Sequence, residues 1–190
     1  MWKTLIQGHV DYCSQLYFPH NSADMLKIES LQQTFTKKIP EVCHINYWNR
    51  LQHLKMYSQE RRMERYRVLY AWKIIEGISP NCGLLVTNSD RRGRQLVIPP
   101  VKSNGKVSSL REASFQVHGP RLFNALPKSI RNLTKVPVDE FKAKLDGFLQ
   151  TIPDEPKLPG YTPSTCNQIT ASPSNSIVDH TRSESTRRPG

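Results

Sequence analysis

The residues of this sequence that are best suited to chemistry are basic, and they form two clusters. These clusters are Arg61, Arg62, Arg65 and Arg67, and then Arg91, Arg92, Arg94, Lys102 and Lys106. Guanidinium groups bind phosphates through several N–H donors, and nearby aromatic rings can stack on bases. Tyr57, Tyr66 and Tyr70 accompany the first cluster. The pattern is typical of a surface that follows a nucleic-acid backbone, and also of a solvated basic face, so both interpretations stay open here.

Motifs of nucleotide-dependent and metal-dependent catalysis are absent from the sequence. The chain has no Gly-x-x-x-x-Gly-Lys, Gly-x-Gly-x-x-Gly, Gly-x-Ser-x-Gly or His-Glu-x-x-His segment. Two-metal polymerase or nuclease chemistry needs two or three carboxylates that converge on magnesium, and no such set is recognisable. The cysteines lack any Cys-x-x-Cys pair, so neither a zinc site nor a disulfide framework is indicated. We expect no self-contained active site, no cofactor and no metal.

The overall charge narrows the possible partners. The 190 residues carry a formal net charge of +11, which favours contact with nucleic acid or an anionic membrane surface. No apolar run approaches the roughly 20 residues of a membrane-spanning helix. The N-terminal residues also lack the apolar segment of a signal peptide. We therefore expect an intracellular protein, in the nucleus or cytoplasm, that does not enter a membrane.

The first cluster lies in a predicted long helix over residues 58–77. Ser58 can accept hydrogen bonds from the first turn, and Gly77 can adopt the left-handed conformation that ends a helix. The second half of this segment, around Trp72, is apolar in almost every direction, so other elements must enclose it. The first half carries the arginines, and we expect it to present them at a surface.

The remaining elements are predicted to give a mainly α fold with three regions. Residues 1–78 form a four-helix bundle-like module, with helices ending before Pro19, running from Ser22 to Ile39, and beginning at Asn46. Residues 79–150 form a basic, small extended or β-hairpin segment followed by a C-terminal helix, with a strand at 95–98, a second strand or extended stretch at 109–117 and the helix at 138–149. Residues 151–190 are rich in Pro, Ser and Thr and are predicted to be disordered, since they cannot offset an ordering entropy of ~1–2 kcal/mol per residue.

Several short motifs occur along residues 4–149 in a defined order. The first half contains His9-x-Asp11-Tyr12-Cys13-Ser14 before Pro19, Leu31-Gln32-Gln33-x-Phe35-Thr36-Lys37-Lys38-Ile39, and Tyr47-x-x-Arg50-Leu51-x-x-Leu54-x-x-x-Ser58-x-x-Arg61-Arg62. The second half contains Arg92-Gly93, Phe115, Leu122-Phe123-Asn124-Ala125-Leu126-Pro127, Ile130, and Phe141-Lys142 with Leu145. Together they resemble the C-terminal part of reverse transcriptases from non-LTR (LINE-type, jockey-like) retrotransposons. Departures from the family pattern keep the residue's shape: Gly8 replaces a proline, Tyr17 and Phe123 replace tryptophans, and Ala125 replaces a serine.

The resemblance implies a thumb and post-thumb region, which in that family packs beside the template–primer duplex. The palm domain, with its Phe/Tyr-x-Asp-Asp metal site, would lie N-terminal of Met1, and this chain has no Asp-Asp pair. No catalytic residue is therefore carried over, and we expect no enzyme activity from the chain alone. The expected partners are an RNA or RNA–DNA duplex backbone and the palm and fingers domains of the parent polymerase.

We expect six arginines to neutralise phosphates without reading sequence, namely Arg61, Arg62, Arg65, Arg91, Arg92 and Arg94. One alternative is a small helical protein–protein interaction scaffold whose arginines are merely solvated. Another is a product that does not fold stably without its missing neighbour.

Overall fold

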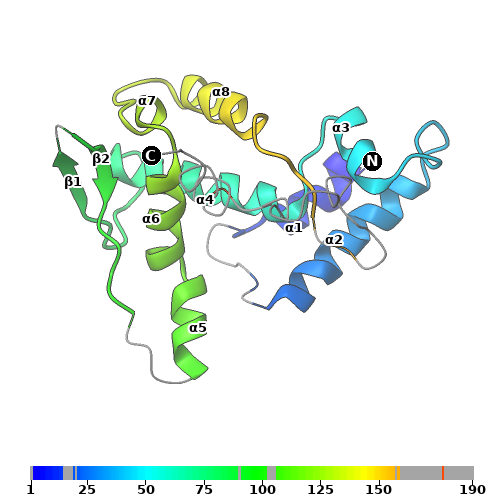
Figure 1. Ribbon diagram of the computed structural model, residues 1–190, viewed down its shortest axis with the longest axis horizontal. Coiled ribbons are helices and arrows are strands. Elements are labelled where there is room, and N and C mark those ends of the chain that lie inside the picture. The colour runs from blue at the N-terminus through cyan, green and yellow to red at the C-terminus, as the bar shows by residue number, and fades with distance from the viewer. Residues whose placement is uncertain are drawn as a thin grey trace, which may run out of the picture.

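The computed structural model describes residues 2–14, 19, 21–89, 91–101, 106–156, 158 and 177. These residues form a mainly helical molecule with one two-stranded antiparallel sheet. The prediction of a mainly α fold is confirmed. In chain order the elements are η1 (a π-helical turn, Trp2–Ile6), α1 (Gln7–Asp11), α2 (Ser22–Lys37), α3 (Tyr47–His53), α4 (Gln59–Ile75), β1 (Val86–Ser89), β2 (Gly93–Leu96), α5 (Lys106–Ala113), α6 (Phe115–Ala125), α7 (Lys128–Arg131) and α8 (Val138–Leu149). Helix α4 crosses the middle of the molecule, with the hairpin near one end and α2 and α3 near the other (Figure 1).

Helix α4 forms where its capping residues predict. The Ser58 hydroxyl accepts from the Arg61 N–H at 3.1 Å, and Gly77 follows the helix with φ +74°. Trp72 is fully buried; its ring stacks on Phe141 of α8 with centroids 4.3 Å apart. Its indole N–H donates to the Leu133 carbonyl at 3.0 Å. The prediction that the second half of α4 lies in the core is confirmed.

Two hydrophobic cores hold the described residues together. The larger one joins the second half of α4 to the hairpin, α6, α7 and α8, so residues on both sides of the predicted boundary at residue 78 share it. The smaller one lies at the other end, around α3, and contains Tyr47, Trp48, Leu51 and Leu158. No helix in the described ranges is long and apolar enough to cross a membrane.

The segment after residue 105 differs from its prediction. Residues 109–117 were expected to be extended, but they belong to α5 and α6, which meet at Ser114. From Phe115 onward the buried residues follow helical spacing, with Gly119, Leu122 and Phe123 on the inner face. A short apolar run cannot be assigned to strand or helix by periodicity alone, and here packing against α4 selects the helix.

Part of the predicted disordered tail is packed against the helices. Ile152 is buried, the Asp154 carboxylate accepts from the Ser58 N–H at 2.8 Å, and the Trp48 indole N–H donates to the Pro156 carbonyl at 3.1 Å. The prediction of disorder is therefore wrong for residues 151–156, because backbone and side-chain acceptors there satisfy donors of α3 and α4. Most of residues 157–190 lie outside the described residues.

The two strands pair in register, with Val86 opposite Leu96 and Asn88 opposite Arg94. The strand predicted at residues 95–98 therefore begins earlier, at Gly93, and ends at Leu96. Strand β1 was not predicted. Gly93 has φ +70°, and a Cβ there would lie 2.7 Å from Oδ1 of Asn132, so the turn needs glycine for its conformation and for the close approach of α7.

Candidate nucleic-acid interface

The first arginine cluster was predicted to lie at the surface, but in the structure its side chains are buried or partly buried. Arg61 is fully buried. Its guanidinium donates to the Pro153 carbonyl at 3.1 Å and lies 4.0 Å from the Glu64 carboxylate. The expectation that Arg61 is an exposed phosphate contact is therefore corrected, because the segment after α8 covers this face of α4.

Arg62 and Arg65 are each paired with an aspartate from a distant part of the chain. Arg62 Nε and Nη2 donate to the two oxygens of Asp11 at 2.8 and 2.7 Å. Arg65 Nε and Nη2 donate to those of Asp146 at 2.5 and 2.8 Å. Both guanidinium groups also lie by the Tyr66 ring, at 5.5 and 5.9 Å from its centroid. The positive charges of Arg62 and Arg65 are thus matched by the two negative charges of Asp11 and Asp146.

These pairs hold the arginines firmly in the charged form. Burial lowers the pKa of Arg62, but the hydrogen bonds and charge of Asp11 outweigh it and raise the pKa above its ordinary value. Hydrogen bonds donated to the Asp146 carboxylate raise the pKa of Arg65 against a smaller opposing effect of burial. A phosphate could use these arginines only by displacing a bidentate carboxylate.

Arg67 is buried on the opposite face of the helix. Its Nη1 donates to the Ala113 carbonyl at 2.8 Å and lies 2.9 Å from Nδ1 of His118. Burial, followed by the charges of Arg67 and Arg121, lowers the pKa of His118 to about 4. Arg67 therefore joins α4 to α6 and does not face the solvent.

The second cluster has a different setting. Arg91 and Arg92 lie in the turn between β1 and β2, and both side chains are exposed. The backbone around them is held by a side chain of α7, because Arg131 donates to the carbonyls of Arg92 and Arg94 at 3.1 and 2.8 Å. The Arg94 N–H donates to Oδ1 of Asn132 at 2.9 Å. The turn thus presents two exposed arginines on a backbone anchored to α7.

Arg94 itself belongs to an internal contact. Its Nη1 lies 2.5 Å from the Glu76 carboxylate, its Nη2 donates to the Ile75 carbonyl at 3.1 Å, and its side chain is only 13% exposed. The expectation that Arg94 is an exposed phosphate contact is corrected. Lys102 lies outside the described residues, as does the side chain of Lys106.

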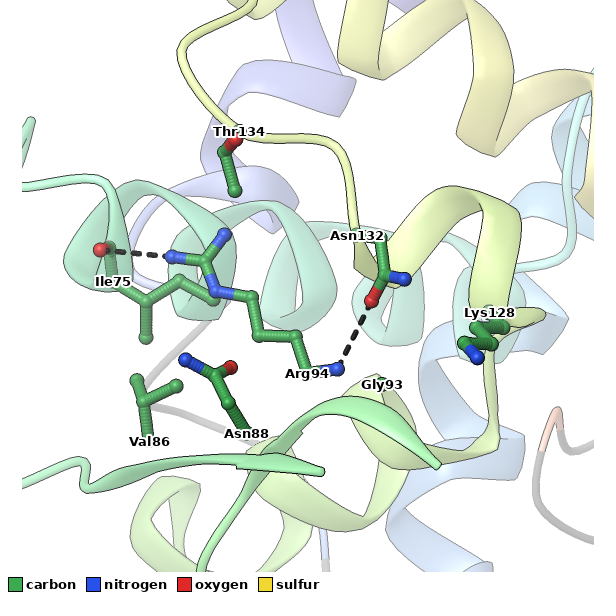
Figure 2. A pocket seen from close by; sticks show the side chains of 8 residues that line it. All are labelled: Ile75, Val86, Asn88, Gly93, Arg94, Lys128, Asn132 and Thr134. Carbon is green, nitrogen blue, oxygen red and sulfur yellow. Dashed lines mark hydrogen bonds between the residues drawn. The ribbon is translucent and has the colours of Figure 1, made fainter. Parts of the chain in front are cut away.

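A pocket of about 610 Å³ lies beside the basic turn. It is formed where the hairpin meets the end of α4 and the α7 segment, and the guanidinium of Arg94 extends across it (Figure 2). The lining residues combine amides, a hydroxyl, two cations and two aliphatic side chains; they are Ile75, Val86, Asn88, Gly93, Arg94, Lys128, Asn132 and Thr134. The pocket can therefore offer hydrogen bonds, positive charge and a partly apolar wall to one ligand.

Sequence reasoning did not identify the residues that build this region. The Asn124 side chain of α6 accepts from the Leu96 N–H and donates to the Leu96 carbonyl, at 2.8 Å each. Arg131 and Asn132 bind the backbone at the start of β2. In the sequence, Asn124 stands out only as a member of the motif at residues 122–127. The Lys128–Arg131 segment, followed by Asn132, carries a basic signal in the sequence, but its position beside the turn depends on the fold.

Among the described residues, no group of three or more His, Cys, Asp and Glu side chains is placed to hold a metal ion. Comparisons of the chain with protein-family models, with curated proteins and with solved structures found no match.

Proposed function

We propose that this protein binds nucleic-acid backbones through the basic turn, as the non-catalytic C-terminal part of a non-LTR retrotransposon type of RNA-directed DNA polymerase. The polymerase assignment depends on the ordered motifs of the sequence. The binding assignment is supported above all by the exposure of Arg91 and Arg92 on an anchored turn. The partners would be an RNA or RNA–DNA duplex and the palm and fingers domains, in the nucleus or cytoplasm.

The charges around the turn favour phosphate. Lys128 is exposed on α7, and its Cγ would lie 3.0 Å from a Cβ placed at Gly93. Lys128 therefore adds a third positive charge near Arg91 and Arg92. Among the described residues beside the turn, the Glu76 carboxylate is engaged by Arg94 and by the Lys135 N–H at 2.7 Å. The described part of this surface thus carries the exposed basic side chains of Arg91, Arg92 and Lys128.

Rigid anchoring also favours binding. An exposed arginine on a mobile loop loses conformational entropy when it contacts phosphate. A turn that is already fixed by side-chain contacts loses less. Arg131 donates to the carbonyls of Arg92 and Arg94, and Asn132 accepts from the Arg94 N–H. The contacts carry no base information, so we expect binding that is indifferent to sequence.

The test is the salt dependence of binding to an RNA–DNA duplex, measured by fluorescence anisotropy. Each neutralised phosphate of duplex DNA contributes a slope of ~0.9 in log affinity against log salt. The Arg91→Gln/Arg92→Gln variant should lower the slope by roughly two. Lys37→Gln/Lys38→Gln removes the same charge from exposed positions at the end of α2 and serves as the matched control. Equal effects of the two variants would show that only net charge matters.

A second candidate function, the protein–protein scaffold, is favoured by apolar side chains near the hairpin. Leu85 and Val97 face each other through a backbone hydrogen bond of 2.9 Å, and Leu85 is 64% exposed. Ile78 and Ile98 are exposed nearby in the chain. Exposed apolar patches mark interaction sites. The scaffold would bind a protein partner normally after Arg91→Gln/Arg92→Gln and would lose it after Leu85→Ser/Ile98→Ser.

A further inference from the structure

We propose that the pocket beside the basic turn receives one unpaired nucleobase, so that the protein prefers single-stranded RNA or DNA to a blunt duplex. This inference rests on the proposed function, because the basic turn would hold the phosphates that flank the base. It adds a ligand class and a specific site to a surface that otherwise only neutralises charge.

The size and lining of the pocket suit a single base. Its volume of about 610 Å³ lies within the ~300–1,000 Å³ of small-ligand sites. Ile75 and Val86 provide aliphatic surface, and Asn88, Asn132 and Thr134 provide hydrogen-bonding groups (Figure 2). A nucleobase likewise combines apolar faces with a polar edge.

Arg94 offers a stacking surface. Its N–H groups are engaged in the plane of the guanidinium, by the Glu76 carboxylate and the Ile75 carbonyl. In-plane hydrogen bonds leave the two flat faces of a guanidinium able to stack, and unpaired bases stack on such planes. The two acceptors also fix the orientation of the plane before any ligand arrives. The contacts that make Arg94 a poor phosphate ligand therefore make it a good platform for a base.

Two amides are placed to read the edge of a base. Asn132 is oriented by the hydrogen bond from the Arg94 N–H to its Oδ1 at 2.9 Å, and its Nδ2 points toward Lys128 (Figure 2). Asn88 extends from β1 into the space beside the Arg94 guanidinium (Figure 2). An amide presents a donor and an acceptor side by side, which matches the paired groups on base edges that become accessible in a single strand.

The adjoining charges suit the phosphate of the same nucleotide. Gly93 lines the pocket and directly follows Arg92, and Lys128 lines it from α7. A base stacked on Arg94 would therefore have cations on the turn and on α7 for its phosphates. A base paired in a blunt duplex is stacked on both sides and cannot enter, which gives the expected preference for unpaired strands.

The presence of a base in the pocket is tested first by NMR titration of the full chain. Adenosine 5′-monophosphate should shift the side-chain amide signals of Asn88 and Asn132, with assignments checked in the Asn88→Ala variant. Ribose 5-phosphate carries the same phosphate without the base and should leave both signals in place. Equal shifts with ribose 5-phosphate, or with an acidic peptide of glutamates, would overturn the proposal in favour of an anion site or a peptide site.

A second experiment compares a single-stranded RNA 12-mer with a blunt RNA–DNA duplex of the same sequence. Arg94→Lys keeps the charge but removes the plane, and it should weaken single-strand binding by about five- to a hundredfold, the range for one stacked base. Asn88→Ala changes an exposed residue and should weaken the same binding by a smaller factor while the fold, checked by circular dichroism, is kept. Duplex binding should stay unchanged in both variants.

The outcomes separate this inference from the proposed function. Equal losses for single strand and duplex, or no loss for either, would overturn the base pocket. The proposed function would fail on a different result, namely that Arg91→Gln/Arg92→Gln leaves the salt slope of duplex binding unchanged.

Discussion

Two basic regions of the molecule resemble each other in sequence and differ in their surroundings. On α4, Arg62 and Arg65 lie one turn apart, and each makes two hydrogen bonds to an aspartate. In the hairpin turn, the side chains of Arg91 and Arg92 are exposed, and Arg131 binds the backbone carbonyl of Arg92. One region uses its arginines to join helices, and the other presents them to the solvent.

The carboxylates explain the difference. The first half of α4 is surrounded by acidic side chains from α1, α2, α8, the segment after α8 and α4 itself; these are Asp11, Glu29, Asp146, Asp154 and Glu64. The described residues around the basic turn contribute one, Glu76. A cluster of arginines therefore indicates nucleic-acid binding only where the fold leaves the arginine side chains exposed.

The largest expected effect concerns the core residue that seats α8, and hence Asp146, against α4. Trp72→Ala removes the stack on Phe141 and the hydrogen bond to the Leu133 carbonyl, and it should lower the free energy of unfolding by about 3–5 kcal/mol. Urea denaturation measures the change. The exposed substitution Leu110→Ala on α5 is a control, expected within ~0.5 kcal/mol. A shift below about 1 kcal/mol for Trp72→Ala would contradict the packing that pairs Asp146 with Arg65.

The buried carboxyl group of Glu29 in α2, which accepts from the Gln59 N–H at the start of α4, gives a prediction about pH. Burial raises the pKa of Glu29 to about 8, against hydrogen bonds from Tyr47 and the Gln59 N–H, and with help from the charges of Asp154 and Glu60. A raised folded-state pKa means that stability is full below the unfolded value of 4.5 and is lost as pH rises toward 8. Unfolding free energy should therefore fall across this window in the native chain.

Glu29→Gln should remove that decline, because a neutral amide has no proton to lose. The measurement is urea denaturation at several pH values between 5 and 8, with the two chains compared at each. His118, whose pKa is lowered to about 4, acts in the opposite sense, since its contribution to stability is lost as pH falls below its ordinary value of about 6.5. Parallel curves for the native chain and Glu29→Gln would contradict the buried-carboxylate account.

A smaller effect tests whether the aspartates really mask the α4 arginines. Asp11→Asn/Asp146→Asn removes two negative charges while keeping oxygens that can accept from Arg62 and Arg65. The salt slope for duplex binding should then increase by up to about two, since the two arginines can contact phosphate. Glu41→Gln/Glu112→Gln changes charge equally at exposed positions and should increase the slope less. Identical slopes for the two variants would mean that the carboxylates do not mask a binding site.

Local signals predicted a good part of this fold. The caps at Asn46 and Ser58 place α3 and α4 correctly, and the apolar spacing of residues 138–149 gives α8 its observed bounds. The errors arise where long-range contacts decide. Residues 115–117 are helical as part of α6, which packs beside α4. Residues 151–156 are packed because they supply acceptors to Ser58, Arg61 and Trp48.

The candidate site was predictable only as a list of basic residues. Asp11 lies 51 positions from Arg62, and Asp146 lies 81 positions from Arg65, so no local pattern shows that these charges are paired. Likewise, the hydrogen bond from the Arg94 N–H to Oδ1 of Asn132 spans 38 positions. Such contacts are a property of the folded chain, and they separate the buried arginines from the exposed ones.

The central claim is that the basic turn, and not the basic half of α4, contacts phosphate. The most direct test compares Arg91→Gln/Arg92→Gln with Arg62→Gln/Arg65→Gln, two variants that each lose two positive charges, in salt titrations of binding to one RNA–DNA duplex. We expect the slope to fall by roughly two for the turn variant and to change little for the α4 variant, whose cost should appear instead as lost stability. A slope that falls for the α4 variant and stays unchanged for the turn variant would contradict the account.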